Sequence, residues 1–135
     1  MKMKTFFCLA VLCLAISPVM GEDKSADIKA VTKRVSVEEF DQLRSGTNVV
    51  LLDVRTKAEF EKGRIPGAKN LDVNSPRFAE HLAALDKSKT YLVNCEVGMR
   101  SARACKKMDA LGFTTVYELT SGFDAWRKAR KPIEK

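Results

Sequence analysis

One cysteine stands out among the residues that could do chemistry, because of the loop in which it lies. Cys95 begins the stretch Cys-Glu-Val-Gly-Met-Arg-Ser and follows the apolar run at residues 91–93. The pattern predicts a strand before this loop and a helix after it, so that the thiol faces the positive end of the helix dipole. Gly98 lets successive backbone N–H groups turn toward one anion, and Arg100 adds a positive charge. These features favour a thiolate, so we predict that Cys95 is a nucleophile; the alternative is a small apolar side chain at a strand end.

Two charged residues near another apolar run are candidates for support of this loop. Asp53 ends the run at residues 49–52, and Arg55 precedes Glu59 by four residues. On a helix this spacing allows an ion pair, so we expect Arg55 to pair with Glu59. We predict that Asp53 and Arg55 brace the region beside the cysteine loop; the alternative is direct contact with the substrate.

A second cysteine and the single histidine fit structural positions. Cys105 lies on an apolar stripe with helical spacing, so we predict a buried core residue, with a resolving cysteine as the alternative. The stripe consists of Ser101, Ala104, Cys105, Met108 and Leu111. His81 lies in a helical segment among Ala and Leu, so we expect a surface or half-buried side chain rather than a general base. The spacing of Cys and His residues predicts no metal site, and no Gly-rich loop leads into Lys-Ser or Lys-Thr.

The first 21 residues have the pattern of an export signal. Lys2 and Lys4 precede an apolar run at residues 6–16, and Gly21 suits the last position before a cleavage site. This run is shorter than the roughly 20 residues that a membrane-spanning helix needs. We therefore predict a signal peptide at residues 1–21 and a periplasmic or secreted product. A lipoprotein anchor is the alternative, although the two cysteines of this segment lie within the apolar run rather than at its end.

The remaining chain has the length and composition of one globular domain. The 135 residues are 45% hydrophobic and 30% charged, and the formal net charge of +7 becomes +5 without the two lysines of the leader. We predict a flexible tail at residues 22–30 and one domain at residues 31–135. The excess charge is moderate and mixed with acids, so we expect small anionic substrates, no nucleic acid, and no stable membrane insertion after cleavage.

Strand and helix signals alternate along this domain. Apolar runs without alternation are typical of strands buried on both faces of a parallel sheet. Capping boxes at residues 36–39 and 56–59, and Ser75 followed by Pro76, indicate helix starts. The expected strands are one ending at residue 35 and those at 49–52, 67–71, 91–93 and 115–119, and the expected helices are 36–43, 56–62, 76–85, 101–111 and 123–129. This order predicts an α/β architecture with helices on both faces of a parallel sheet. We also expect Phe123 and Trp126 to be core aromatic residues that anchor the last helix.

Five short stretches, in order along the chain, give the sequence a family resemblance. They are residues 51–55 with Glu59 and Phe60, residues 65–68, residues 95–101, residues 111–113 with Val116 and Tyr117, and residues 122–126. Together they resemble a single-domain rhodanese, a thiosulfate sulfurtransferase-like domain, over residues 34–132. The resemblance implies a three-layer α/β fold whose central parallel sheet has about five strands. It also implies that Cys95 carries a persulfide.

The resemblance further implies a transfer reaction without cofactor or metal. A small sulfane-sulfur donor, thiosulfate or a persulfide, would load Cys95, and a thiol, cyanide or a partner protein's cysteine would accept the sulfur. Substrate would be bound by the rest of the loop: Glu96, Val97, Gly98, Met99, Arg100 and Ser101. The alternatives are a sulfur-carrier or sensing module without turnover, and a thiol-oxidation protein that uses Cys95 and Cys105.

Some positions bear on which substrate fits. Related phosphatases of this fold have five residues between the cysteine and the arginine of the loop, whereas four residues separate Cys95 from Arg100 here. The shorter loop suits a single sulfur atom better than a phosphate group, so a phosphatase or an arsenate reductase is disfavoured. Arg64 lies where the family usually has His, and we expect this change to affect the hydrogen bonds of a turn rather than catalysis. Ser121 lies where the family usually has Gly, which puts the tightness of the turn before the last helix in doubt. Glu96 would partly offset Arg100 and oppose a dianion such as thiosulfate; the alternative is a carboxylate that points to solvent.

Overall fold

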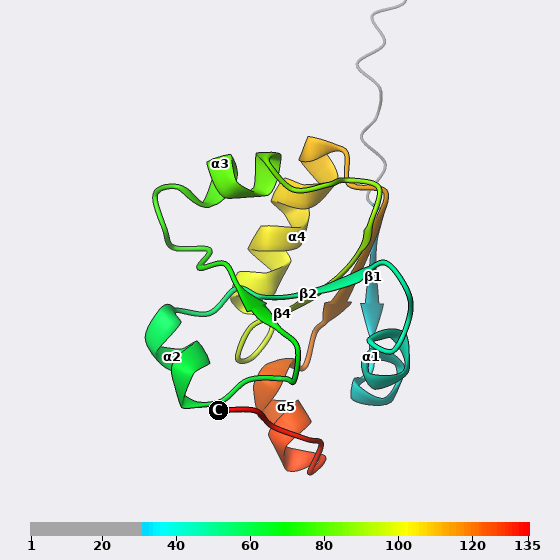
Figure 1. The fold of residues 1–135 in the computed structure, drawn as a ribbon, viewed down its shortest axis with the longest axis vertical. Coiled ribbons are helices and arrows are strands. Elements are labelled where there is room, and N and C mark those ends of the chain that lie inside the picture. Colours follow the sequence, from blue (N-terminus) through cyan, green and yellow to red (C-terminus); the bar gives the residue numbers. More distant parts are fainter. Residues whose placement is uncertain (1–30) are drawn as a thin grey trace, which may run out of the picture.

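Parallel strands and helices alternate through the chain (Figure 1). The computed structural model describes residues 31–135, so the predicted signal peptide and tail lie outside the described residues. The strands are β1 (Thr32–Val35), β2 (Val49–Asp53), β3 (Lys69–Asn70), β4 (Thr90–Asn94) and β5 (Thr115–Leu119). The helices are α1 (Val37–Leu43), α2 (Lys57–Lys62), α3 (Phe78–Ala83), α4 (Met99–Leu111) and α5 (Gly122–Lys128). The strands form one five-stranded sheet in the order β1-β5-β4-β2-β3 with every pairing parallel, which confirms the predicted fold class.

Two hydrophobic cores lie on opposite faces of the sheet, because successive side chains of a strand point to opposite sides. Tyr91 and Val93 of β4 pack with α3 and α4, whereas Leu92 between them packs with α1 and α5. In the second core the rings of Phe40 and Trp126 meet edge to face, with centroids 6.3 Å apart. Both faces of the sheet are therefore covered, as the unalternated apolar runs predict.

Capping residues start two of the helices as predicted. Thr56 and Glu59 form a reciprocal capping box at α2. At α1 the hydroxyl of Ser36 accepts a hydrogen bond from the Glu39 N–H at 3.2 Å. These bonds satisfy backbone N–H groups that the first turn of a helix leaves without partners.

Some predicted boundaries are wrong. The helix expected from residue 76 begins at Phe78, because the carbonyl of Ser75 accepts from the Phe78 N–H at 3.0 Å and closes a turn ahead of it. The third strand consists of Lys69–Asn70 alone and lies at the edge of the sheet, where within residues 31–135 it pairs with β2 and no other strand. In contrast, α4 begins at Met99, two residues before the expected start.

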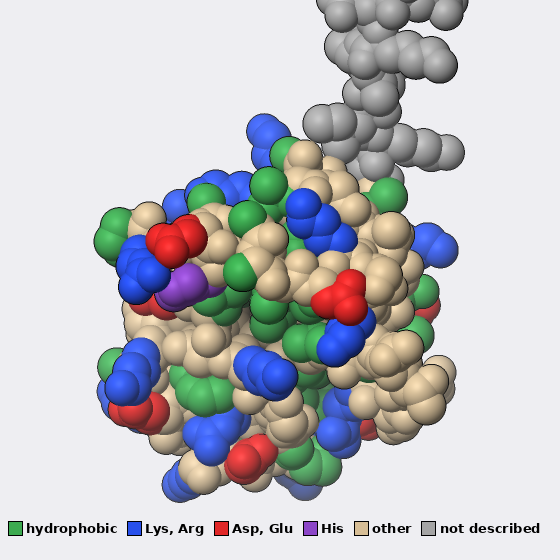
Figure 2. Space-filling view, turned by 45° about the horizontal axis from the view of Figure 1, so that its top comes forward, with side chains coloured by type: hydrophobic (Ala, Val, Ile, Leu, Met, Phe, Trp, Pro, Cys, Tyr) green, Lys and Arg blue, Asp and Glu red, His purple; other side chains and the backbone are tan. Residues whose placement is uncertain are grey.

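The surface carries charges of both signs. Lys and Arg side chains are spread over the face shown in Figure 2, with Asp and Glu side chains among them. Among residues 31–135, no helix is long and apolar enough to cross a membrane. Nor do any three His, Cys, Asp or Glu side chains of this described part lie close enough together to hold a metal ion.

Candidate active site

Cys95 directly follows β4, and its sulfur lies at the start of α4. The N–H of Gly98 donates to the Cys95 Sγ at 3.0 Å, and the thiol donates to the Oγ of Ser101 at 3.4 Å. The cysteine is only 1% exposed. Because α4 has thirteen residues, its N-terminus offers a helix dipole and backbone N–H groups without helical partners. The structure thus places the Cys95 sulfur between the end of a strand and the N-terminus of a helix, where the loop sequence predicts it.

A buried carboxylate that the sequence analysis did not single out lies beneath this loop. The hydroxyl of Ser101 is 2.9 Å from the Oε1 of Glu118 and 3.1 Å from the carbonyl oxygen of Gly98. A hydroxyl has one proton, so it donates to one of them at a time while it accepts from the Cys95 thiol. Ser101 is buried, and its hydrogen bonds are with the nucleophile, with Gly98 of the loop and with Glu118 of β5.

Two glycines let the cysteine loop pack against the turn before α5. A Cβ on Gly98, whose φ is +98°, would lie 2.1 Å from the carbonyl oxygen of Thr120. A Cβ on Gly122, whose φ is +71°, would lie 2.2 Å from the carbonyl oxygen of Glu96. No side chain fits at these distances, and both φ values favour glycine. Ser121 has a φ of −81°, which any residue adopts, so a serine does not loosen this turn.

Arg100 is directed toward α2. Its guanidinium makes two hydrogen bonds with the carboxylate of Glu59, at 2.7 and 2.9 Å. Chiefly through these bonds, the pKa of Glu59 is lowered to about 2 and the pKa of Arg100 is raised. Glu59 therefore compensates much of the positive charge that we expected Arg100 to add at the cysteine loop.

Arg55 is bound by Asp53 rather than by Glu59. Its Nε and Nη2 lie 2.6–3.0 Å from the Asp53 oxygens, and Nη2 also donates to the carbonyl of Gly63 at 2.8 Å. Burial opposes the charge of Arg55, but hydrogen bonds and charges from Asp53 and Glu96 outweigh it and raise the pKa of Arg55. The predicted pair of Arg55 and Glu59 is wrong because Arg55 precedes α2, so helical spacing does not apply to it.

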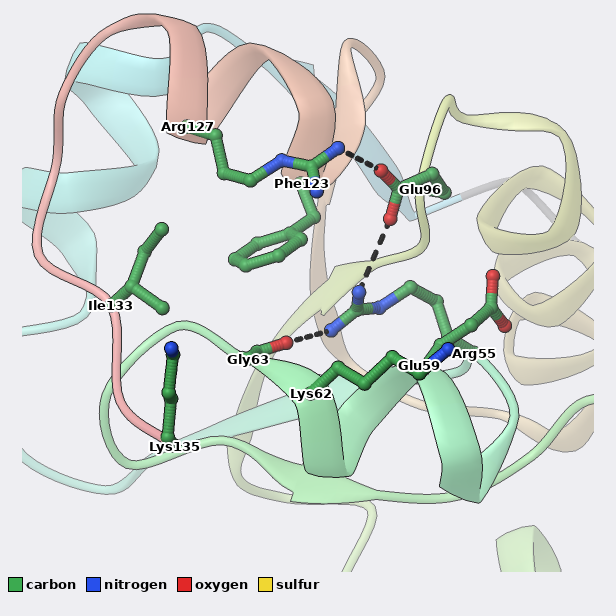
Figure 3. Close-up of a pocket in the computed structure, with 9 residues that line it drawn as sticks. All are labelled: Arg55, Glu59, Lys62, Gly63, Glu96, Phe123, Arg127, Ile133 and Lys135. Carbon is green, nitrogen blue, oxygen red and sulfur yellow. Dashed lines mark hydrogen bonds and ion pairs between the residues drawn. The ribbon is translucent and has the colours of Figure 1, made fainter.

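The carboxylate of Glu96 bridges two arginines (Figure 3). One oxygen accepts from the Nη1 of Arg55 at 3.1 Å, and the other accepts from the Nη2 of Arg127. Glu96 therefore does not point freely to solvent, and that alternative is wrong. It makes no hydrogen bond with Arg100 but is among the charges that raise the pKa of Arg100, so a partial offset of Arg100 stays a prediction. The alternative is wrong for a tertiary reason, because α5 brings Arg127 to the loop from a distant part of the sequence.

A cavity of about 420 Å³ opens beside this bridge (Figure 3). Its lining comes from the segment between β2 and β3, the cysteine loop, α5 and the C-terminal segment: Arg55, Glu59, Lys62, Gly63, Glu96, Phe123, Arg127, Ile133 and Lys135. The guanidinium groups of Arg55 and Arg127 lie over the Phe123 ring, 4.2 and 5.1 Å from its centroid. Sequence analysis missed Arg127, and the only signal for it is its position four residues after Phe123 on one helix face.

The C-terminal segment forms a wall of the cavity because it pairs with the turn after α2. The main chains of Arg64 and Glu134 exchange two hydrogen bonds of 2.9 Å. The side chain of Glu134 also accepts from the Gly67 N–H at 3.1 Å, and the Nε1 of Trp126 donates to the Pro132 carbonyl at 2.8 Å. The main chain of Arg64 therefore anchors the segment that carries two lining residues of the cavity.

The remaining candidates divide into exposed and buried side chains. Val97 and Met99 project from the loop and are 60% and 77% exposed. His81 is also exposed, as expected. Cys105 is buried in the core as predicted, and this burial raises the pKa of its thiol strongly. Cys95 and Cys105 are both free thiols.

The fold and the cysteine loop match a known family. Residues 36–129 match the model of the rhodanese-like domain. The match covers more than half of the chain, which therefore belongs to the rhodanese-like family, as the five motifs indicate.

Relatives of known name and structure agree with this assignment. The thiosulfate sulfurtransferase GlpE of Shewanella oneidensis is 33% identical over 97 residues, which cover 72% of this chain and 94% of that protein. The putative sulfurtransferase YtwF of Bacillus subtilis is 35% identical over 92 residues, covering 68% and 86%. A rhodanese-like domain protein from Staphylococcus aureus superimposes with a TM-score of 0.61 at 28% identity, covering 70% of this chain and 90% of that chain. A rhodanese-related protein from Thermoplasma volcanium has the same fold, with a TM-score of 0.68 at 24% identity and coverage of 76% and 97%.

Proposed function

We propose that this protein is a sulfurtransferase that carries sulfur on Cys95 as a persulfide. In the first step the Cys95 thiolate attacks the outer sulfur of a donor such as thiosulfate. The S–S bond of the donor breaks, and sulfite leaves with the electron pair of that bond. In the second step a thiolate or cyanide attacks the outer sulfur of the persulfide, and the Cys95 thiolate is the leaving group.

The observation that carries this proposal is the hydrogen bond from Gly98 to the Cys95 sulfur at the N-terminus of α4. Both the thiolate and the persulfide anion place negative charge where this N–H group and the helix dipole stabilise it. The names of the relatives from Shewanella oneidensis and Bacillus subtilis support the reaction class. The short loop between Cys95 and Arg100 supports transfer of sulfur rather than of phosphate.

Mass spectrometry of the intact protein tests the proposal. Incubation with thiosulfate should add about 32 Da, the mass of one sulfur atom, and cyanide should remove it as thiocyanate. Cys95→Ser should gain no mass and should form no thiocyanate while it keeps the fold. Loading without turnover would favour the sulfur-carrier alternative, and a loss of two hydrogens would favour a disulfide between Cys95 and Cys105. Thiocyanate formation within a few-fold of the wild-type rate by Cys95→Ser would remove this residue from the mechanism.

We also propose that the protein is exported and that its physiological acceptor is a small thiol or a partner protein's cysteine. The pattern of residues 1–21 supports export. Mass-spectrometric sequencing of protein taken from cells should find an N-terminus near Glu22. A cell-derived protein that begins at Met1 would contradict cleavage.

A further inference from the structure

One side of α4 packs on the core, and the other side is exposed to solvent. The exposed residues recur at helical spacing and form what we call the α4 face: Met99, Arg103, Lys106, Lys107 and Ala110. From Met99 to Ala110 this face runs for about 16 Å along the helix axis. A groove of about 380 Å³ lies on it, lined by the three cationic residues and Ala110. The α4 face thus begins at the cysteine loop and extends away from it (Figure 1).

The cations of the α4 face have no acidic partner. Arg103, Lys106 and Lys107 make no ion pair with any residue of the described part, 31–135. The single acid of α4, Asp109, is engaged with β1, where its Oδ1 accepts from the Thr32 N–H at 3.2 Å and the Thr32 hydroxyl at 2.9 Å. Three positive charges therefore lie within about 6 Å along the helix without a counter-charge on this face.

The other helices of residues 31–135 are different in this respect. Each of them, taken with its capping residues, has a cation paired with an acid three or four positions away: Arg44 with Asp41, Lys57 with Glu61, Arg77 with Glu80, and Lys128 with Asp124. Such pairs compensate the charge of an exposed helix within the helix itself. The α4 face has no such compensation, so its charge is free to act on a partner.

Neighbouring side chains hold two of these cations in place. The Nη2 of Arg103 donates to the Oδ1 of Asn74 at 3.0 Å. The ammonium group of Lys107 lies 5.4 Å from the centroid of the Phe78 ring of α3. Because long side chains lose conformational entropy when a partner immobilises them, this positioning lowers the entropic cost of binding an anionic group.

Apolar side chains continue this surface at the cysteine loop. Val97 and Met99 are 60% and 77% exposed, and Ile133 is the only other exposed large apolar side chain of the described residues. Protein interfaces combine an apolar centre, often with Met, and a polar rim. Since Cys95 is only 1% exposed, a macromolecule that reaches its sulfur has to contact the exposed residues of the loop.

We propose that the α4 face is the docking surface for an acidic segment of a partner protein whose cysteine accepts sulfur from Cys95. The inference rests on the proposed function and adds the surface and the charge of the partner. Carboxylates of the partner pair with Arg103, Lys106 and Lys107, and an apolar side chain of the partner covers Met99. The partner's thiolate attacks the outer sulfur of the Cys95 persulfide, the S–S bond to Cys95 breaks, and Cys95 leaves as a thiolate.

The number of cations favours a protein over other anionic partners. Binding to nucleic acid through phosphates can involve about six to ten contacts, and clusters that bind anionic lipids have roughly four to eight Lys or Arg residues. The α4 face has three such residues and is joined to exposed apolar side chains. A transient protein interface, which buries less than about 1,200 Å² in total, fits a surface of this size.

Transfer of sulfur to synthetic peptides tests this proposal. One acceptor peptide has a single cysteine flanked by glutamates, and the matched peptide has glutamines in their place. Mass spectrometry of the intact protein follows the loss of sulfur from loaded Cys95 to each peptide. Each rate is divided by the rate of the same peptide with a small disulfide, which corrects for the ionisation of its thiol. The acidic peptide should react at least about fivefold faster at low ionic strength, and salt should reduce this ratio.

Variants of the α4 face should remove the preference for the acidic peptide. Combining Arg103→Met, Lys106→Met and Lys107→Met should bring the ratio of the two rates to about one, while transfer from loaded Cys95 to cyanide stays unchanged. Lys106→Met alone should lower the ratio about twofold, so that the test does not depend on the combined variant. The matched control removes the same charge from exposed lysines outside the α4 face by combining Lys33→Met, Lys57→Met and Lys69→Met, and it should leave the ratio unchanged.

The outcomes separate this inference from the proposed function. Equal corrected rates for the two peptides, or a ratio that the control variant lowers as much as the α4 variant does, would overturn the inference. If transfer to cyanide is normal in that case, the proposed function still stands. Equal rates together with binding to phosphatidylglycerol vesicles that the α4 variant abolishes would assign the face to lipid and also overturn the inference.

A second measurement needs no sulfur chemistry. If Cys95 forms no persulfide, the proposed function is wrong, and docking is then tested by NMR titration with an acidic peptide in which serine replaces the cysteine. This peptide should shift the amide signals of α4 in the wild type but not in the combined α4 variant. The absence of such shifts in the wild type would overturn the docking surface as well.

Discussion

Replacement of Glu96 by glutamine should improve the binding of thiosulfate, because it frees positive charge at Arg127. In the structure the Glu96 carboxylate bridges Arg127 and Arg55. Arg55 remains held by the buried carboxylate of Asp53, so the charge released is mainly that of Arg127. Glutamine has the same size and still offers an oxygen to either arginine, so the loop should keep its shape.

The size of this effect follows from the exposure of the pair. The Glu96 and Arg127 side chains are 25% and 47% exposed. Partly exposed ion pairs contribute about 0.2–1 kcal/mol, which corresponds to at most about a fivefold change in affinity. We therefore expect Glu96→Gln to lower the KM for thiosulfate by up to about fivefold at low ionic strength. At high ionic strength the change should be smaller, because salt screens such charges.

Steady-state kinetics at two ionic strengths would measure this effect. Arg127→Met should raise the KM for thiosulfate. Adding Glu96→Gln to Arg127→Met should not lower this KM, because Glu96→Gln acts through the charge of Arg127. Urea unfolding of each variant serves as the control for stability. The reasoning is refuted if Glu96→Gln leaves the KM for thiosulfate unchanged at low salt. It is also refuted if Glu96→Gln lowers this KM by the same factor when Arg127 is replaced by Met.

Three further predictions concern the loop, its ion pairs and the core. Gly98→Ala should abolish sulfur transfer and destabilise the fold, because the added Cβ would lie 2.1 Å from a backbone carbonyl oxygen. Gly67→Ala is the matched control, because Gly67 has a φ of +82° but no atom within 4 Å of an added Cβ; it should lower the free energy of unfolding in urea by only about 1–2 kcal/mol. Glu59→Gln should be less stable than the wild type above about pH 5, and the difference should vanish as the pH falls toward 2, because Arg100 holds the pKa of Glu59 at about 2 in the folded protein against about 4.3 unfolded. Cys105→Ala should keep persulfide formation and lose about 1 kcal/mol of stability, because burial raises the pKa of Cys105 and keeps it an unreactive thiol.

Each of these predictions has an outcome that contradicts it. Equal losses of stability in Gly98→Ala and Gly67→Ala would mean that the contact of the loop with the turn before α5 is unimportant. A stability difference for Glu59→Gln that persists near pH 2 would contradict the assigned ion pair. Loss of turnover in Cys105→Ala at unchanged stability would make Cys105 a resolving cysteine.

Local interactions explain why so much of the fold could be predicted from the sequence. The capping box of Thr56 and Glu59 and the left-handed backbone at Gly112 depend on neighbours within a few residues, so the types of those residues suffice. The continuous apolar runs of β2 and β4 similarly require burial on both sides of a sheet. The position of Cys95 between a strand and a helix follows from these elements, and with it the hydrogen bond from Gly98.

Only the tertiary structure decided the partners of the charged residues around this cysteine. The spacing of Arg55 and Glu59 suggests a pair, but Arg55 lies before the helix and binds Asp53 instead. Glu96 meets Arg127 because α5 is hydrogen-bonded to the loop, and no pattern near either residue specifies that meeting. A helix or strand is determined by neighbours along the chain, whereas an ion pair forms with whichever opposite charge the packing of distant segments brings within about 4 Å.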